Sequence, residues 1–351
     1  MKFRYFLPFF AVFISTAFLF KAVTGFWADS EIWAVTLSKV KFFSFTAENT
    51  IPADSLGLYF KPLHHLLIKF TYILFPDSWN ILTINRSVGA AIGFGIAIVY
   101  ARVFYEILYD RKGFILAFIA ILATTLFFER GYRIRADLLA SLFHGLILLE
   151  FFHLQRKTDA FDIKISTFLL VIYELCMVLS TVKYLPVLVL LNILYFFLLA
   201  GESKEHYWVR FYKTKFLIQV FLVFAILLGI HFYTPHFLEN YVQELIKYSM
   251  EADMAATGEN ETKFIHVFRW VSGNPLIWVG YISLVVFSLM RLFLSREKVF
   301  TFEKNKNFLT FYSILFLIYV LATPEKYSYF IASVSPIFTI LSLIYLVHFI
   351  G

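Results

Sequence analysis

The stretch FWADSEIWAV, residues 26–35, places two carboxylates, Asp29 and Glu31, directly after a long apolar run. A positioned carboxylate can take the proton from a hydroxyl group as that hydroxyl attacks, which is the role of a general base. The competing interpretation is a solvated helix end, because several polar loops of this chain are rich in acidic residues. Both interpretations depend on which other groups lie beside this pair.

Basic and tyrosine side chains also gather where apolar runs end. They occur in the stretches YFKPLHHL, ERGYRIRADLLAS, STVKYLP and TPEKYSYFIASVSP. Cations and hydroxyl donors stabilise a leaving phosphate whose negative charge grows as its bond breaks, and they do so more in the transition state than in the ground state. The donors of this kind are Tyr59, Lys61, Arg133, Arg135, Lys183, Lys326 and Tyr327.

Structural alternatives exist for several of these residues. Arg133 and Arg135 would also anchor a turn to lipid headgroups. Asp137 fits the N-cap of the helix that follows it, and it would also hold one of the two arginines in place. Lys183 has a stronger functional case, since it lies between two apolar stretches, where a lysine is expensive unless it is paired.

The composition is that of a polytopic membrane protein. Hydrophobic residues make up 60% of the chain and charged residues only 16%, with a mean hydropathy of +0.75. Many apolar runs approach the roughly 20 residues that a helix needs to cross a bilayer. The single cysteine, Cys176, has no partner in the chain, so no intrachain disulfide is expected.

These runs predict an all-α integral membrane protein in which residues 1–351 form a single transmembrane domain of about ten spans. The first run lacks a cleavage site and is interpreted as a retained anchor. The predicted spans are 5–27, 84–108, 114–128, 138–154, 165–181, 184–200, 214–233, 275–293, 308–322 and 329–349.

The distribution of charge predicts the topology. The loops on one side, together with the N-terminus, carry an excess of lysine and arginine over acidic residues, so this side and both termini are expected to be cytoplasmic. The net charge of +7 is then a consequence of topology and indicates no nucleic-acid partner. In a cell inner or plasma membrane, the non-cytoplasmic segments would be two long outer loops, 28–83 and 234–274, and two short turns, 129–137 and 323–328.

One apolar segment of the first outer loop is too short to span. In YFKPLHHLLIKFTYILFP, about 14 residues follow Pro62, and both flanks must lie on the outer side. We expect a helix at the membrane interface that begins near Pro62, since proline suits a first helical turn.

The order of these motifs resembles the GT-C superfamily of membrane glycosyltransferases. The particular resemblance is to protein O-mannosyltransferases and lipid A aminoarabinose transferases, which use polyprenyl-phosphate sugars. It rests on an acidic motif after the first span, a Lys-Pro-containing interfacial helix, an Arg-rich turn ending in Asp, a TxK…LP turn and a late K-Y-x-Y…P segment. The family's doubled proline after the lysine is a single Pro62 here, and no soluble domain follows the last span.

The resemblance implies a GT-C-like fold and an enzyme, a polyprenyl-phosphate-dependent hexosyl- or pentosyltransferase. The donor would be a polyprenyl-phosphate-linked sugar and the acceptor a lipid, glycan or protein, with inversion at the sugar on the outer face and membrane lipids around the chain. Asp29 resembles the catalytic base and Glu31 would orient it. Asp137, His64 and His65 would support the site.

A divalent metal ion is the one cofactor left open, because some relatives bind one near this position. Adjacent residues point about 100° apart on a helix, so His64 and His65 do not easily chelate one ion. Glu174, which lies in the middle of a span, is expected to face the bundle interior, paired with Lys21 or Arg86 or contacting substrate.

Two other classes of membrane protein are alternatives, and each is expected to have a different sequence pattern. A transporter or lipid flippase would need charged residues distributed through its spans and access from both sides. A non-glycosyl membrane transferase, such as an acyltransferase, usually has a buried histidine near an Asp or Asn, and His144 has no such neighbour in the sequence.

Overall fold

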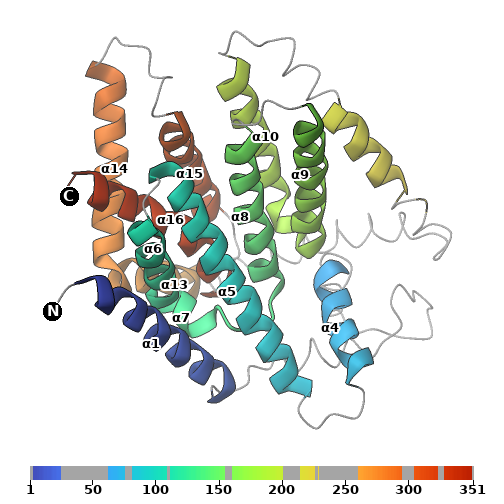
Figure 1. The fold of residues 1–351 in the computed structure, drawn as a ribbon, viewed down its shortest axis with the longest axis horizontal. Coiled ribbons are helices and arrows are strands. Elements are labelled where there is room, and N and C mark those ends of the chain that lie inside the picture. Colours follow the sequence, from blue (N-terminus) through green and yellow to red (C-terminus); the bar gives the residue numbers. More distant parts are fainter. Residues whose placement is uncertain are drawn as a thin grey trace.

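The computed structural model describes most of the helical part of the chain. The residues it describes are 3–24, 62–75, 81–108, 111–154, 160–200, 214–225, 228, 260–294, 304–322 and 328–349. Within these residues the chain is almost entirely helical and contains no β-strand (Figure 1), in agreement with the predicted all-α class.

The helices follow the apolar runs of the sequence. A short helix at Thr214–Ala225 is named helix 214–225. The other elements are α1 (Phe3–Thr24), α4 (Pro62–Leu74), α5 (Ile81–Leu108), α6 (Arg111–Ala123), α7 (Thr125–Arg130), α8 (Ala136–Leu154), α9 (Ala160–Ser180), the 3-10 helix η2 (Val182–Tyr184), α10 (Leu185–Ala200), α13 (Asn260–Gly273), α14 (Pro275–Leu294), α15 (Lys304–Ala322) and α16 (Ser328–Phe349).

Four helices in the described part of the chain are long and apolar enough to cross a membrane: Phe6–Thr24, Thr83–Leu108, Ala136–Leu154 and Phe161–Ser180. They coincide with four of the predicted spans and indicate a membrane protein. Shorter apolar helices occur at Thr214–Ala225, Pro275–Val286, Phe308–Leu321 and Phe330–Leu346. The count of ten spans, the topology and the GT-C-like fold stay predictions.

The predicted span 114–128 is interrupted in the structure. α6 ends at Ala123 and α7 begins at Thr125, so the run is divided at Thr124. The hydroxyl of Thr124 donates to the carbonyl oxygen of Ala120 at 3.0 Å, and the backbone N–H of Thr125 donates to Asn274 Oδ1 at 3.2 Å. A side chain from the α13–α14 junction therefore accepts a hydrogen bond at the break.

α16 runs through the centre of the bundle, where it contacts α5, α8 and α14 (Figure 1). Residues 330–342 of this helix are all buried, although several of them are serines or threonines. The hydroxyl of Ser333 donates to the carbonyl oxygen of Phe330 at 2.7 Å and that of Ser335 to Ala332 at 2.9 Å. Small side chains that satisfy their hydroxyls within the helix let neighbouring helices approach closely.

His144 of α8 lies at the centre of this core. Its Nδ1 is 2.7 Å from the hydroxyl of Tyr100 on α5, and its Nε2 is 2.7 Å from the hydroxyl of Tyr312 on α15. The imidazole, which is 1% exposed, joins three helices through both ring nitrogens. Its hydrogen-bond partners are tyrosines.

Candidate functional site at one end of the helix bundle

The Arg-rich turn between α7 and α8 packs directly on α5. A Cβ atom placed on Gly89 would lie 2.3 Å from the carbonyl oxygen of Tyr132 and 2.7 Å from the backbone nitrogen of Ile134. A Cβ atom on Gly93, one helical turn later, would lie 2.4 Å from the carbonyl oxygen of Gly131. Only glycine allows this approach of backbone to backbone, so the backbone of residues 131–134 packs directly against α5.

Arg86 lies on the same side of α5, three residues before Gly89, and is 1% exposed. Its Nη1 donates to the carbonyl oxygen of Ala22 near the end of α1 at 3.3 Å, and its guanidinium lies 5.5 Å from the ring centroid of Tyr132. From the sequence alone, Arg86 is expected only as a partner of Glu174. Arg86 lies near the start of a predicted span, three and seven residues before Gly89 and Gly93, so all three residues lie on one face of the helix. This spacing is the sequence signal that indicates a role for Arg86 beside the turn.

α4 covers the turn from another side. It begins at Pro62, as predicted. The ring Nε2 of His64, which is buried, lies 3.2 Å from the carbonyl oxygen of Ile134. The hydroxyl of Thr71 donates to Asn85 Oδ1 on α5 at 2.9 Å. The side chain of His65 lies outside the described residues.

The outer side of α4 is apolar and exposed. Among the side chains of this helix that the structure describes, the exposed ones are Leu66, Phe70, Ile73 and Leu74. His64 and Thr71 are buried against the protein while these apolar groups are exposed, which fits a lipid environment better than water. This arrangement is consistent with the predicted interfacial helix.

The charged residues of the turn differ in burial. Arg133 and Asp137 are buried, whereas Arg135 is partly exposed. The N-cap predicted for Asp137 is wrong, because α8 begins at Ala136 and Asp137 lies in its first turn. The carbonyl oxygen of Arg135 accepts the bond from the backbone N–H of Leu139 at 3.1 Å, which is the position of a cap residue. A carboxylate in the first turn is still favoured by the helix dipole.

The second predicted turn, which contains Lys183, meets α8, α15 and α16. The hydroxyl of Tyr184 lies 3.0 Å from Ser333 Oγ, and the carbonyl oxygen of Ser333 accepts a hydrogen bond from Ser141 Oγ at 2.6 Å. The hydroxyl of Tyr319, near the end of α15, donates to the carbonyl oxygen of Lys183. Lys183 itself is partly exposed.

The contacts of Arg86 and of the Arg-rich turn bring the end of α1 and the start of α5 together, at the lower end of the bundle in Figure 1. The start of α8 follows this turn in the sequence, and η2 contacts α8 and α16 through Tyr184. Six predicted site residues lie outside the described residues and their positions stay predictions: Asp29, Glu31, Tyr59, Lys61, Lys326 and Tyr327. Among the described residues, no three His, Cys, Asp or Glu side chains lie together so as to hold a metal ion.

A separate polar cluster joins the opposite ends of α5 and α8. Arg102 Nη2 lies 2.6 Å from Glu106 Oε1, and Nε2 of His153 lies 3.4 Å from the same oxygen. Arg102 lies about 20 Å along α5 from Gly89 at the helical rise per residue. It is therefore remote from the Arg-rich turn.

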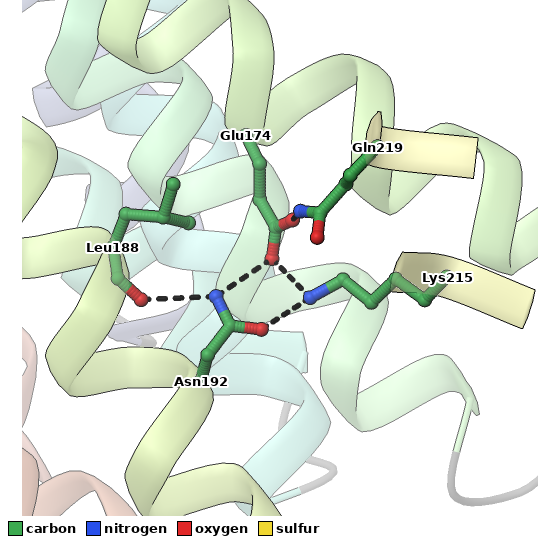
Figure 2. A network of polar contacts seen from close by, with 5 residues as sticks. All are labelled: Glu174, Leu188, Asn192, Lys215 and Gln219. Carbon is green, nitrogen blue, oxygen red and sulfur yellow. Dashed lines mark hydrogen bonds and ion pairs between the residues drawn. The ribbon is translucent and has the colours of Figure 1, made fainter. Parts of the chain in front are cut away.

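Glu174 faces the bundle interior, as predicted, but its partner is Lys215 and not Lys21 or Arg86 (Figure 2). Its carboxylate accepts from Lys215 Nζ at 2.5 Å, from Asn192 Nδ2 at 3.2 Å and from Gln219 Nε2. Lys215 also donates to Asn192 Oδ1. Arg86 donates to the carbonyl oxygen of Ala22, whereas Lys215 extends from helix 214–225 toward α9 and is 2% exposed.

No protein-family model, curated protein or solved structure matches this chain.

Proposed function

We propose that this protein is an integral membrane glycosyltransferase of the GT-C type. It takes a sugar from a polyprenyl-phosphate donor and passes it to a lipid, glycan or protein acceptor on the non-cytoplasmic face. The observation that carries the proposal is the seat of the Arg133–Arg135 turn on α5, beside the end of α1 that precedes Asp29 and Glu31 in the sequence.

A rigid cationic turn suits a phosphate leaving group. The backbone of residues 131–134 lies against Gly89 and Gly93, so Arg133 extends from a fixed backbone and Arg135 directly follows it. Fixed donors stabilise growing negative charge without reorganising during the reaction, which is the largest single contribution in many enzymes. An arginine also matches the geometry of phosphate oxygens through two parallel N–H bonds.

The proposed reaction is a single displacement. The oxygen of an acceptor hydroxyl forms a bond to C1 of the sugar while the bond from C1 to the phosphate oxygen breaks, and the electron pair of that bond goes to the phosphate. The hydroxyl proton goes to Asp29, which Glu31 orients. The departing phosphate is held by Arg133, Arg135, Lys61, Lys183 and Lys326, with hydroxyl donors from Tyr59 and Tyr327, and the anomeric centre is inverted.

A transporter or lipid flippase is the second candidate, favoured by the Glu174–Lys215 pair inside the bundle. Both carboxylate oxygens of Glu174 already accept hydrogen bonds, from Lys215, Asn192 and Gln219. A saturated pair of this kind suits a fixed link between helices better than a site that exchanges ions. A histidine-dependent acyltransferase is disfavoured, because both ring nitrogens of His144 are bonded to tyrosines.

The proposal is tested by mass spectrometry of cell-envelope glycans in cells that lack the chain and in cells that re-express it. We expect loss of one sugar residue from one glycan, lipid or protein class without the chain, and its return with the wild-type protein. Arg135→Ala or Lys326→Ala should lower formation of this product at least about tenfold, since a charge-assisted hydrogen bond is worth ~1.5–3 kcal/mol.

The matched control is Arg102→Gln, which removes an arginine from the opposite end of α5. It should restore the product fully at equal amounts of membrane protein. Identical glycans with and without the chain would contradict the proposed function. Full activity of both Arg135→Ala and Lys326→Ala would show that the phosphate is held elsewhere.

A further inference from the structure

Arg86 links three parts of the candidate site through a single buried group. Its guanidinium donates to the carbonyl oxygen of Ala22 on α1, and it lies over the ring of Tyr132 in the Arg-rich turn. The same tyrosine ring meets Phe18 of α1 edge to face, with 5.9 Å between the ring centroids. Tyr132, which is 1% exposed, is thus held by α1 and α5 together.

The contacts of Arg86 depend on the shape of its side chain as well as its charge. A guanidinium is planar, so it can donate a hydrogen bond from its edge while its face lies on an aromatic ring. A lysine ammonium is a compact point charge without a face and cannot make both contacts in the same way. A charged side chain inside a membrane protein is costly and commonly has a function.

Arg86 contacts both the helix that leads to the proposed base and the turn that carries the proposed phosphate ligands. Ala22 lies seven residues before Asp29 in the sequence, and Tyr132 directly precedes Arg133. The backbone of the turn is seated on Gly89, three residues after Arg86 on the same helix. One side chain therefore ties the helix that leads to the carboxylates to the turn that carries the arginines.

We propose that Arg86 is a positioning residue of the transfer reaction. It fixes the position of the Arg133–Arg135 turn relative to the end of α1, the helix that precedes the proposed base in the sequence. This inference rests on the proposed function. Misplacement of reacting groups by about 1 Å can lower a rate by about 100-fold, so a residue that acts only through position has a measurable effect on kcat.

The distance between the end of α1 and the Arg-rich turn is measured by electron paramagnetic resonance in nanodiscs. Spin labels are attached to Thr24→Cys at the end of α1 and Glu129→Cys beside the turn, both of which are exposed, with Cys176 replaced by serine. We expect a narrow distribution of distances in the otherwise wild-type protein and a broader or displaced distribution in Arg86→Lys and Arg86→Met. Tyr132→Phe keeps the ring and should leave the distribution unchanged, whereas Tyr132→Leu should broaden it.

The product assay then separates position from stability. Arg86→Lys and Tyr132→Leu should lower the product about tenfold or more at equal amounts of folded protein, and Tyr132→Phe should stay within about twofold of wild type. The combination of Arg86→Met with Tyr132→Leu should be no worse than Arg86→Met alone, because both remove the same link. Binding of undecaprenyl phosphate by Arg86→Lys should stay within about threefold of wild type, since the phosphate donors are still present.

Several outcomes would overturn the inference. An unchanged distance distribution in both Arg86 variants would show that Arg86 does not fix the position of the turn, whatever happens to the product. A changed distribution with wild-type product would show that this fixed position is not needed for transfer. If the chain makes no difference to any glycan, the proposed function fails, and with it the role of Arg86 in transfer. The distance measurement still decides whether Arg86 links α1 to the turn.

Discussion

Lys215 and Glu174 form an ion pair between helix 214–225 and α9, with 2.5 Å between Nζ and Oε1. Both side chains are almost completely buried, at 2% and 1% exposed. The apolar side chains of helix 214–225 are mostly exposed, including Phe216, Leu217 and Phe221. The polar network in Figure 2 is therefore a principal link between this helix and the rest of the bundle.

Breaking this pair is expected to destabilise the protein strongly. Glu174→Ala or Lys215→Met leaves one buried charge without its counter-ion, which typically costs about 3–5 kcal/mol. Thermal unfolding in nanodiscs should show a clear loss for each single variant and a partial recovery for Glu174→Lys combined with Lys215→Glu. Lys164→Met, an exposed lysine on the same helix as Glu174, is the control. Equal stability of all these variants would contradict the link.

Gly89 is expected to tolerate no side chain. Its Cβ would lie 2.3 Å from a backbone oxygen, so Gly89→Ala must displace the Arg-rich turn, whereas in Gly95→Ala the nearest atom is a flexible Leu142 methyl carbon at 3.3 Å. We expect Gly89→Ala to lose about 1–3 kcal/mol of stability and most of its product formation. Gly95→Ala should be close to wild type in both assays. Similar behaviour of the two variants would mean that the backbone of the turn does not pack against Gly89.

Helices whose positions depend on the local sequence pattern are predicted from the sequence. The apolar runs predict α5, α8 and α9, and Pro62 marks the start of α4, because composition and the proline ring act within a few residues. The interior orientation of Glu174 also follows from its place in an apolar run.

Long-range packing decides the features that the sequence leaves open. The break at Thr124 depends on Asn274, which is distant in the chain, and the partner of Glu174 belongs to another helix. The link from Arg86 to Ala22 and Tyr132 requires three segments to be placed first. The helix start at Ala136 places Arg135, and not Asp137, at the cap position.

The predicted topology can be tested by cysteine labelling in intact cells, with Cys176 replaced. Cysteines at Ser55, Glu129 and Thr257 should react with an impermeant thiol reagent, since their segments are expected to be outside. A cysteine at Lys112, an exposed residue on the side expected to be cytoplasmic, should react only after permeabilisation. Labelling of Lys112→Cys in intact cells, together with protection of two of the three other cysteines, would mean that the predicted topology is inverted or wrong.

Asp29 is predicted to be the general base. Asp29→Asn keeps the shape of the side chain but removes the proton acceptor, so kcat should fall by about 10²- to 10⁴-fold while donor binding changes little. Glu31→Gln should have a smaller effect, because an orienting residue loses geometry and not the proton acceptor. Initial rates of product formation in membranes with matched protein amounts measure both. Full activity of both variants would make FWADSEIWAV a solvated helix end.

The proposed phosphate site at the Arg-rich turn is tested by locating a bound lipid phosphate, using electron cryomicroscopy of the protein in nanodiscs with undecaprenyl phosphate. We expect phosphate density within about 3 Å of the Arg135 guanidinium, the distance of a charge-assisted hydrogen bond. This density should disappear in Arg135→Ala and persist in Arg102→Gln. Phosphate density beside Lys215 and Glu174, or none at the Arg-rich turn at saturating lipid, would show that the turn does not bind the donor phosphate.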